Sequence, residues 1–341
     1  MANRARRHHV IPSFYLAGFT ASGLKDGCLY VFDQGQISSW QSTPMKAGHR
    51  RDFYAVDLGP DVDPACFESD VLAPLETEFS RVVRTLVETK KLPEGDDFNV
   101  LLNFIAVMAT RTPRIRRLVS RVTDMVMKYV VQSQVATDEG WQQFCDCCRR
   151  AGGDLDVAQD QEMRKFIAGG EYTIDLDRTS HVQKIVELVE GTLALLAQRR
   201  WSLAIAAPGT PDFVCSDAPV KMVPTAAFGE QDQLHLANPH TLVAMPLTRR
   251  TLLWGCYEES PPVVQVNEFC VLSINAITIT EAKQVFSPEE DFVYLGSDKR
   301  ARRRSDLIEF LRARNGKYSH LDEAVEDWFH KRFMRPGETK G

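Results

Sequence analysis

The stretch FNVLLNFIAVMAT, residues 98–110, is apolar on nearly every face of a helix. A helix that is hydrophobic all round must be buried, so this segment predicts a central helix surrounded by other elements. Asp96 or Asp97 can cap its start, and Pro113 forces a kink or a restart after its end. This pattern therefore predicts a core built around one buried helix.

Amphipathic helices are expected on both sides of this segment. From residue 66 to about 90, apolar residues recur at helical spacing between Phe67 and Leu86, and Pro74 predicts a kink or a break within them. Residues 114–135 and 179–200 carry similar stripes. Two shorter helices are expected at about 138–150 and 157–168.

Short β-rich runs bounded by glycine or proline precede and follow the helices. We therefore predict an α+β fold, with a central helical layer packed on short, mostly antiparallel strands. One composite domain is expected over residues 1–341, and it divides into an extended segment (1–65), a helical layer (66–200), a strand-rich segment with one helix at about 266–280 (201–297) and a basic helical tail (298–341). The tail predicts helices near 305–314 and 319–333.

Composition excludes several classes of protein. In 341 residues, 44% are hydrophobic and 26% are charged, which is typical of a globular chain and not of a disordered or collagen-like one. The net charge of −5 supplies no global positive field for nucleic acid. No apolar run is long enough to span a membrane, and no signal peptide is recognisable, so a cytoplasmic protein without a membrane partner is expected.

The eight cysteines do not predict a structural zinc site. Cys145, Cys147 and Cys148 lie together on an expected helix, but no second pair of cysteines or histidines lies nearby. Reduced thiols are the expected state.

The adjacent histidines His8 and His9 are the first candidate site. Neighbouring residues of a strand point to opposite faces, so at most one imidazole enters a given pocket. His9 could act as a general acid or base and His8 could bind substrate. The text His-His-Val-Ile-Pro also resembles the start of HNH nucleases, but no asparagine-rich hairpin and helix surround His49. A histidine pair without a role is the alternative.

The second and third candidates are the glutamates of the helix after residue 66 and the arginine after residue 110. Glu68 and Glu76 lie eight residues apart, about 80° apart around an α-helix, and could line one side of a pocket. Arg111 follows the buried helix, so its guanidinium needs a carboxylate or a phosphate partner. A salt bridge to Glu76 and an anion-binding role are both open, as is a solvated role for the glutamates.

Asp217 is the fourth candidate, because Ser216 and Asp217 follow a strand and precede Pro219. Asp217 could bind a metal or orient a histidine, or its carboxylate could simply close a turn. Ser216 lacks the glycine-flanked elbow of the serine hydrolases. No phosphate-binding GxxxxGK[ST] or GxGxxG loop occurs, which excludes P-loop NTPases and classical dinucleotide binding.

Over about residues 8–290 the order of these motifs resembles a bacterial family of unknown function, DUF4238. The matching positions are His9, Pro12, Phe14, Tyr15, Leu16, Lys46, Phe53, Tyr54, Glu68, Glu76, Arg111, Thr112, Pro113, Trp201, Ser216, Asp217, Pro219, Val220, Pro246, Leu247 and Asn275. Ala218 departs from the pattern, since many relatives carry asparagine there. The resemblance implies the layout of the chain but no activity.

The leading hypothesis is a hydrolase, nuclease-like, that acts on a phosphate-bearing substrate such as a nucleotide or a nucleic acid. His9, Glu76 and Asp217 would be the catalytic groups or metal ligands, with Mg²⁺ or Mn²⁺ as candidate cofactors, and Lys46, Arg111 and His8 would hold the anion. The basic segments Arg4–Arg7 and Lys299–Arg304 could attract a polyanion. By analogy with other bacterial proteins of this kind, a role in phage defence or toxicity is expected. The alternative is a non-catalytic binding or regulatory protein, in which the same residues form a buried structural network.

Overall fold

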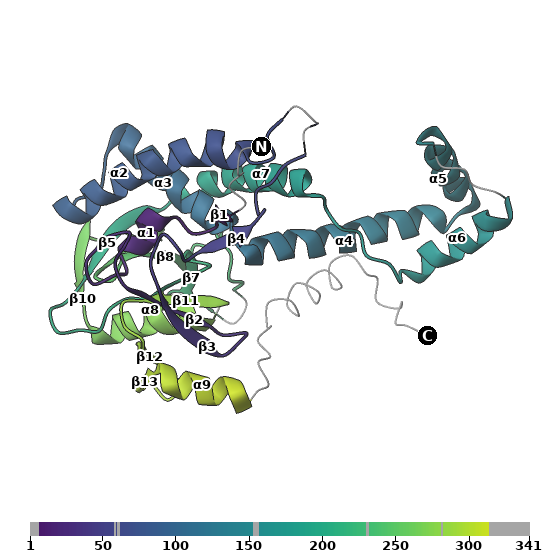
Figure 1. The fold of residues 1–341 in the computed structure, drawn as a ribbon. Helices are drawn as coiled ribbons and strands as arrows, with labels where there is room; N and C mark the ends of the chain where they lie inside the picture. Colours follow the sequence, from purple (N-terminus) through teal and green to yellow (C-terminus); the bar gives the residue numbers. More distant parts are fainter. Residues whose placement is uncertain are drawn as a thin grey trace. The chain divides into compact units, whose positions relative to one another are not determined.

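A computed structural model describes residues 7–57, 59, 62–152, 157–229, 232–280 and 282–313. The contacts of this described part divide it into two compact units, residues 7–114 with 182–313 and residues 115–181. Strands and helices mix in the first unit and the sheets are mostly antiparallel, so the α+β prediction is confirmed (Figure 1). The helical stretch 66–200 is shared between the two units, and the single composite domain stays a prediction.

The buried helix expected from the sequence is present as α3, Gly95–Thr110. Its buried side chains include Leu101, Phe104, Ile105 and Met108, and the chain restarts at Pro113 as α4, Pro113–Val135. Helix α2, Ala73–Thr89, packs beside α3 on one side of the strands (Figure 1). A helix change precedes Pro74, as expected, because α2 continues from a π-helix, η1, Phe67–Leu72.

Two sheets carry most of the strands of the first unit. The five-stranded sheet has the order β10-β5-β9-β8-β7, in which only the β10–β5 pair is parallel. Its strands are β5 (Arg200–Ala206), β7 (Lys221–Pro224), β8 (Thr241–Thr248), β9 (Thr251–Cys256) and β10 (Val263–Val266). The four-stranded sheet has the order β3-β2-β11-β6, all antiparallel, with β2 (Leu29–Asp33), β3 (Ser38–Ser42), β6 (Cys215–Ser216) and β11 (Gln284–Ser287).

A short helix near the start of the chain, α1 (Ser13–Ala17), contacts strand β8. The Tyr15 hydroxyl donates a hydrogen bond of 2.5 Å to the carbonyl oxygen of Pro246. A Cβ atom at Gly18 would lie 2.7 Å from the carbonyl oxygen of Leu247, so only glycine permits this close approach. The motifs around Tyr15 and Pro246 are therefore two halves of one contact.

The histidine pair lies on a two-stranded ribbon of β1, Arg7–His9, and β4, His49–Arg51. Gly48 has a φ of 69°, and its carbonyl oxygen accepts the backbone N–H groups of Val10 and Ile11. This turn sets His9 directly opposite His49. The run 51–56, expected to be extended, forms the last residue of β4 and then a turn.

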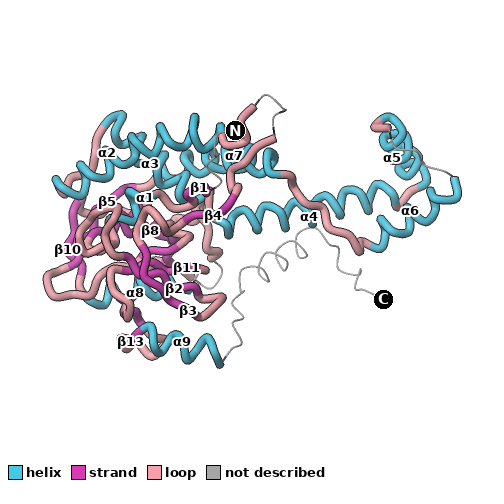
Figure 2. The backbone as a smooth tube through the Cα atoms, viewed as in Figure 1, coloured by secondary structure: helices cyan, strands magenta, loops and turns pink. Residues whose placement is uncertain are grey.

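The remaining elements of the first unit surround the four-stranded sheet. Helix α8, Glu268–Thr280, and helix α9, Arg304–Ala313, share a core with Phe32, Val214 and Val285. Strands β12, Val293–Leu295, and β13, Ala301–Arg303, pair with each other. The tube in Figure 2 shows how loops join these short elements. Helix α7, Arg178–Leu196, begins in the second unit and ends in the first.

The second unit is helical. It holds α4 from residue 115 onward, α5 (Asp138–Arg150) and α6 (Val157–Gly169), with a small core around Val135 and Trp141. In the described part of the chain, no helix combines the length and the hydrophobicity that crossing a membrane requires. The expected helix at 319–333 and the basic residues Arg4–Arg6 lie outside the described residues.

Candidate acid–base site

Five titratable side chains meet where the β1–β4 ribbon approaches η1, α2 and the end of α3. His9 and His49 come from the ribbon, Glu68 from η1, Glu76 from α2 and Arg111 from the residue after α3. We call these five residues the acid–base cluster. Their mutual hydrogen bonds and electrostatic interactions join segments that lie up to 102 positions apart in sequence, so only the fold brings them together.

Arg111 is the cationic centre of the acid–base cluster. Its side chain is only 1% exposed, and its Nη1 donates a hydrogen bond of 2.8 Å to Oε1 of Glu76. The Nε and Nη2 groups of Arg111 are buried and have no partner among the described residues. A buried guanidinium with open donors can still bind a further oxygen atom, because leaving such donors unpaired costs free energy. The salt bridge and the anion-binding role are therefore compatible.

Glu68 faces the same group because its helix is a π-helix. A π-helix turns by about 80° per residue, against about 100° in an α-helix. With four residues of π-helix between them, Glu68 and Glu76 are separated by about two full turns, whereas a continuous α-helix leaves them about 80° apart. The two carboxylates consequently point in similar directions, and each interacts with Arg111.

Glu68 is partly protonated at neutral pH. Burial raises its pKa to about 7, and the charge of Glu76 adds to this increase. One oxygen, Oε1, accepts the backbone N–H of His9 at 3.3 Å, while Oε2 is buried without a partner among the described residues. A carboxyl group of this kind can donate a proton at neutral pH.

The two histidines are neutral under the same conditions. Their ring centroids lie 4.5 Å apart. Burial lowers the pKa of His9 from its ordinary value, with further contributions from Arg111 and Arg7, and burial and His9 lower the pKa of His49 to about 4. The Nε2 atom of His9 is buried and has no partner in the described structure, so a neutral imidazole nitrogen is available to accept a proton.

The acid–base cluster reaches a pocket through Glu76. This pocket has a volume of about 550 Å³, and Ser13, Lys25 and Thr77 also line it. Of the buried side-chain polar atoms that lack a partner in the described structure, four belong to His9, Glu68 and Arg111. Such atoms are rare in folded proteins, and their concentration at one place is typical of a site that awaits water or a ligand.

His8 and Lys46, the other residues expected to bind substrate, are not part of the acid–base cluster. His8 is buried, its Nδ1 accepts the backbone N–H of Tyr54 at 2.8 Å, and its ring stacks on the Tyr54 ring. It faces away from His9, as strand alternation predicts. Lys46 is exposed in the connection between β3 and β4, and its backbone N–H donates to the carbonyl oxygen of Thr43.

Asp217 holds the backbone of a neighbouring strand. Its Oδ1 accepts the backbone N–H groups of Lys283 at 2.9 Å and Gln284 at 3.1 Å. Burial raises its pKa, while these hydrogen bonds and the charges of Lys221 and Arg50 oppose the increase. None of these contacts belongs to the acid–base cluster. Asp217 thus has a structural contact to a distant segment instead of the local turn-closing bond, and the local hydrogen bonds at this turn come from the Ser216 hydroxyl and Ala218.

The side chain of Asn275 also forms hydrogen bonds with backbone groups of other segments. Its Oδ1 accepts the backbone N–H of Val214 at 3.0 Å, and its Nδ2 donates to the carbonyl oxygens of Asp212 and Val293, both at 2.9 Å. The side chain is fully buried and all of its hydrogen-bonding capacity toward these strands is used. We call Asp217 and Asn275 together the backbone clamp.

From the sequence, Glu68 was a weaker candidate than Glu76, and no role was expected for His49. No signal in the sequence distinguishes a π-helix from an α-helix here, apart from Pro74 close by. The partnership of His49 with His9 depends on the turn at Gly48, whose positive φ could be suspected from the glycine alone.

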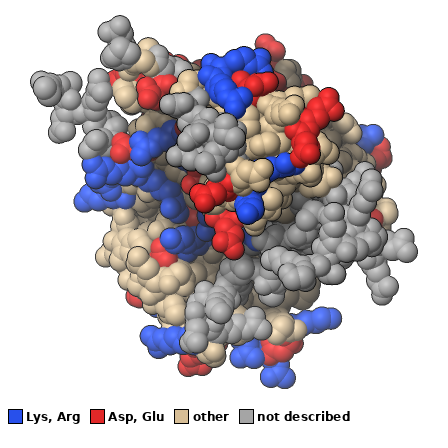
Figure 3. Space-filling view, turned by 90° about the vertical axis from the view of Figure 1, so that its right-hand side faces the viewer, with Lys and Arg blue, Asp and Glu red and all other residues tan. Residues whose placement is uncertain are grey.

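A metal site is not evident in the described residues, since no group of three or more His, Cys, Asp or Glu side chains there could hold an ion. Surface charge is mixed on the face in Figure 3, where lysine and arginine side chains are interspersed with aspartate and glutamate.

Comparison with known proteins gives a family without an assigned activity. The model of a family described as protein of unknown function (DUF4238) matches residues 7–291. A search of curated proteins found no match, and a search of solved structures also found none.

Proposed function

The chain belongs to the DUF4238 family, and on that premise we propose that its acid–base cluster hydrolyses a phosphate ester, in the manner of a nuclease or another phosphoesterase. The observation that carries this proposal is the concentration of buried polar atoms without a described partner on His9, Glu68 and Arg111. With its pKa raised to about 7, Glu68 is about half protonated at neutral pH, and the lowered pKa of His9 favours its neutral form.

Each group has a defined part in the proposed reaction. His9 accepts a proton from a water molecule as the water oxygen attacks phosphorus. Glu68 gives its proton to the leaving oxygen as the phosphorus–oxygen bond breaks, and Arg111 donates hydrogen bonds to the phosphoryl oxygens. Glu76 positions Arg111 through their 2.8 Å hydrogen bond. Proton return from His9 to Glu68 restores the starting state.

The cofactor and the biological setting remain part of the proposal. Mg²⁺ or Mn²⁺ is proposed as an ion that a substrate phosphate would bring with it, because no group of three or more His, Cys, Asp or Glu side chains in the described residues could hold an ion. A cytoplasmic location belongs to the same proposal, as does a role in phage defence or toxicity, which rests on the family analogy alone.

The test is a panel of hydrolysis assays on the full chain. Bis(4-nitrophenyl) phosphate, 4-nitrophenyl phosphate, total RNA, plasmid DNA and single-stranded DNA are each incubated with Mg²⁺, Mn²⁺ or a chelator. Glu68→Gln and His9→Gln are expected to lower turnover by about 10²-fold or more, because each removes one proton-transfer group. Glu78→Gln is the matched control, since Glu78 lies on α2 but is exposed and pairs only with Arg81 in the described structure.

Two results would contradict the proposal. One is the absence of hydrolysis of every substrate by protein whose circular dichroism and melting show that it is folded. The other is equal turnover by Glu68→Gln and Glu78→Gln, which would show that the measured activity does not come from the cluster.

A non-catalytic binding or regulatory protein is the second candidate. The internal pairing of Arg111 with Glu76, and the backbone hydrogen bonds of Asp217, favour it. In that case cluster variants would change thermal stability and leave no enzymatic activity to lose.

A further inference from the structure

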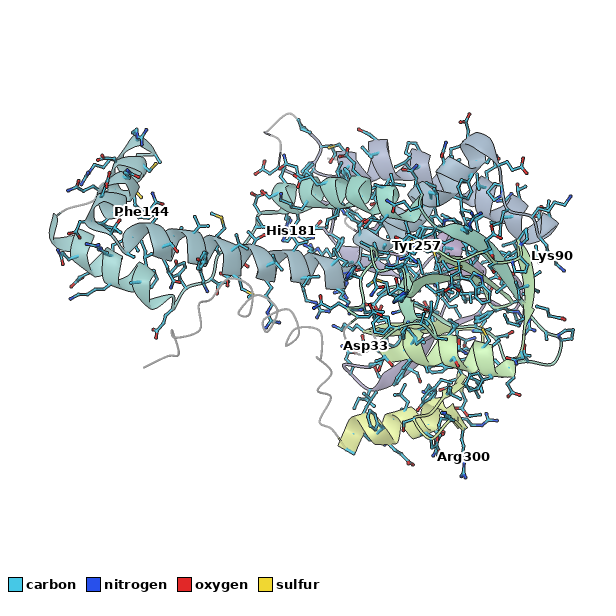
Figure 4. All side chains as sticks on the ribbon, turned by 180° about the vertical axis from the view of Figure 1, so that it is seen from behind. Asp33, Lys90, Phe144, His181, Tyr257 and Arg300 are labelled. Atoms are coloured by element: carbon cyan, nitrogen blue, oxygen red, sulfur yellow. The ribbon has the colours of Figure 1, made fainter. Side chains whose placement is uncertain are left out.

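A groove runs along α2, between this helix and the segment from α1 to Lys25. It consists of the 550 Å³ pocket beside Glu76 and a larger pocket of about 950 Å³. The two pockets share Phe14, Lys25, Ser80 and Arg84, so they adjoin at these residues. The larger pocket extends to Lys90, which Figure 4 labels at the end of α2.

Two cationic side chains at the junction of the two pockets are not held in ion pairs, although the carboxylates of Glu76 and Glu88 also line the pockets. Lys25 and Arg84 are exposed, and neither forms an ion pair within the described structure. Arg81, one turn before Arg84, is instead held by Asp97 at 2.6 Å and by Glu78 at 3.0 Å. An anion at the junction would therefore meet two free cations, while Arg81 is already occupied.

The larger pocket also has an apolar floor. Val83, Val87, Ile205 and Leu247 contribute to its lining. The ring of Phe14 lies against Phe104 of α3, with centroids 5.6 Å apart, so this part of the floor is fixed by the core. Aliphatic side chains beside free cations form a surface for a ligand with an apolar body and a negative head.

We propose that the groove binds an organic phosphate whose organic group is apolar, with the phosphate between Lys25 and Arg84 and the apolar group over Val87. This assignment rests on the proposed function, since it names the substrate class of the same site: the phosphate lies next to Glu76, which leads to Arg111. A nucleic-acid strand fits less well, because the lining of the two pockets holds two aromatic residues, Phe14 and Tyr15, and Tyr15 is only 1% exposed, whereas successive bases need several stacking partners.

The experiment measures binding of ethyl, butyl and octyl phosphate to the full chain by calorimetry. Affinity is expected to rise by about twofold per methylene, half of the roughly fourfold change that complete burial of a methylene gives. Arg84→Ala is expected to weaken every member of the series by about tenfold, and Arg303→Ala, an exposed arginine that lines neither pocket, is the control that leaves binding unchanged. Val87→Asn is expected to flatten the dependence on chain length and keep the ethyl phosphate affinity.

Equal affinities along the series, or equal weakening by Arg303→Ala and Arg84→Ala, would overturn the inference. Tighter binding of adenosine monophosphate or oligothymidylate than of octyl phosphate would overturn it in favour of a nucleotide or nucleic-acid ligand. Repeating the titrations with Glu68→Gln separates phosphate binding in the groove from hydrolysis by the acid–base cluster. Chain-length-dependent binding without turnover by the unmodified chain contradicts only the proposed hydrolysis, and turnover without chain-length dependence contradicts only the apolar substrate.

Discussion

The acid–base cluster and the backbone clamp are both buried and polar, yet they use their polar atoms in opposite ways. Asp217 and Asn275 direct theirs to backbone groups of neighbouring strands. His9, Glu68 and Arg111 have buried atoms without a described partner. A structural network gains stability from complete pairing, whereas a site must keep donors and acceptors open for its ligand. The comparison therefore separates positions that hold the fold from positions that can act.

The largest expected effect on stability comes from the clamp. Asn275→Ala leaves one backbone N–H and two carbonyl oxygens without their hydrogen bonds, so the free energy of unfolding should fall by about 3–5 kcal/mol. Urea unfolding followed by circular dichroism measures this loss. Turnover per folded molecule should stay unchanged, and a specific loss of activity would place Asn275 in the site instead.

Breaking the Arg111–Glu76 ion pair should lower the free energy of unfolding by nearly as much, but a second substitution should restore most of the loss. Arg111→Met leaves the Glu76 carboxylate without its partner and should lower the free energy of unfolding by about 3 kcal/mol. The double variant Arg111→Met/Glu76→Gln should recover all but about 1 kcal/mol, since neither charge then remains. Both variants should lack phosphate-ester hydrolysis. Recovery of activity in the double variant would contradict the role of Arg111.

The pH dependence of stability should identify Glu68. Its pKa is raised from 4.5 to about 7 in the folded state, so the folded chain binds the proton more tightly than the unfolded chain. The stability contributed by this proton is fully present below pH 4.5 and is lost as the pH rises through about 7. The chain should therefore lose about 2 kcal/mol relative to Glu68→Gln between pH 4.5 and 8, after allowance for partial exposure.

The histidines titrate with the opposite sign, since their folded pKa values are lowered. Their contribution is present above pH 6.5 and is lost as the pH falls, with His49 protonated at about pH 4. Comparing Glu68→Gln with the unmodified chain at each pH cancels most of this contribution. Parallel stability curves for the two proteins would show that Glu68 is already ionised at neutral pH.

The smallest expected effect belongs to Asp217. Asp217→Asn keeps an oxygen that can accept the N–H groups of Lys283 and Gln284. The free energy of unfolding, measured by thermal unfolding, should therefore change by less than about 1 kcal/mol. Hydrolysis should continue at the original rate. A large loss of turnover in a stable Asp217→Asn variant would return this carboxylate to the list of catalytic groups.

The sequence predicted the fold more fully than the site. Continuous hydrophobicity identified α3, and helical periodicity located α5 and α6, because burial patterns of long helices are local signals. The central strand β11 of the four-stranded sheet and the short helix α1 were missed, since segments of four or five residues carry little periodicity. Arg111 and Glu76 were paired correctly as an open alternative, because a buried guanidinium requires an anion.

The geometry that joins Glu68 to the cluster depends on matching the number of residues after Glu68 to the type of helix that holds them. A π-turn is equivalent to an α-helix that has gained one residue, so the loss of a single codon between Glu68 and Leu72 would fit an ordinary helix. About seven α-helical steps of roughly 100° would then separate Glu68 from Glu76, about 20° short of two full turns, so Glu68 would still face Arg111. A substitution that turned η1 into an α-helix at unchanged length would instead rotate Glu68 by about 80°, and the cluster would lose its proton donor with that residue still present in the sequence.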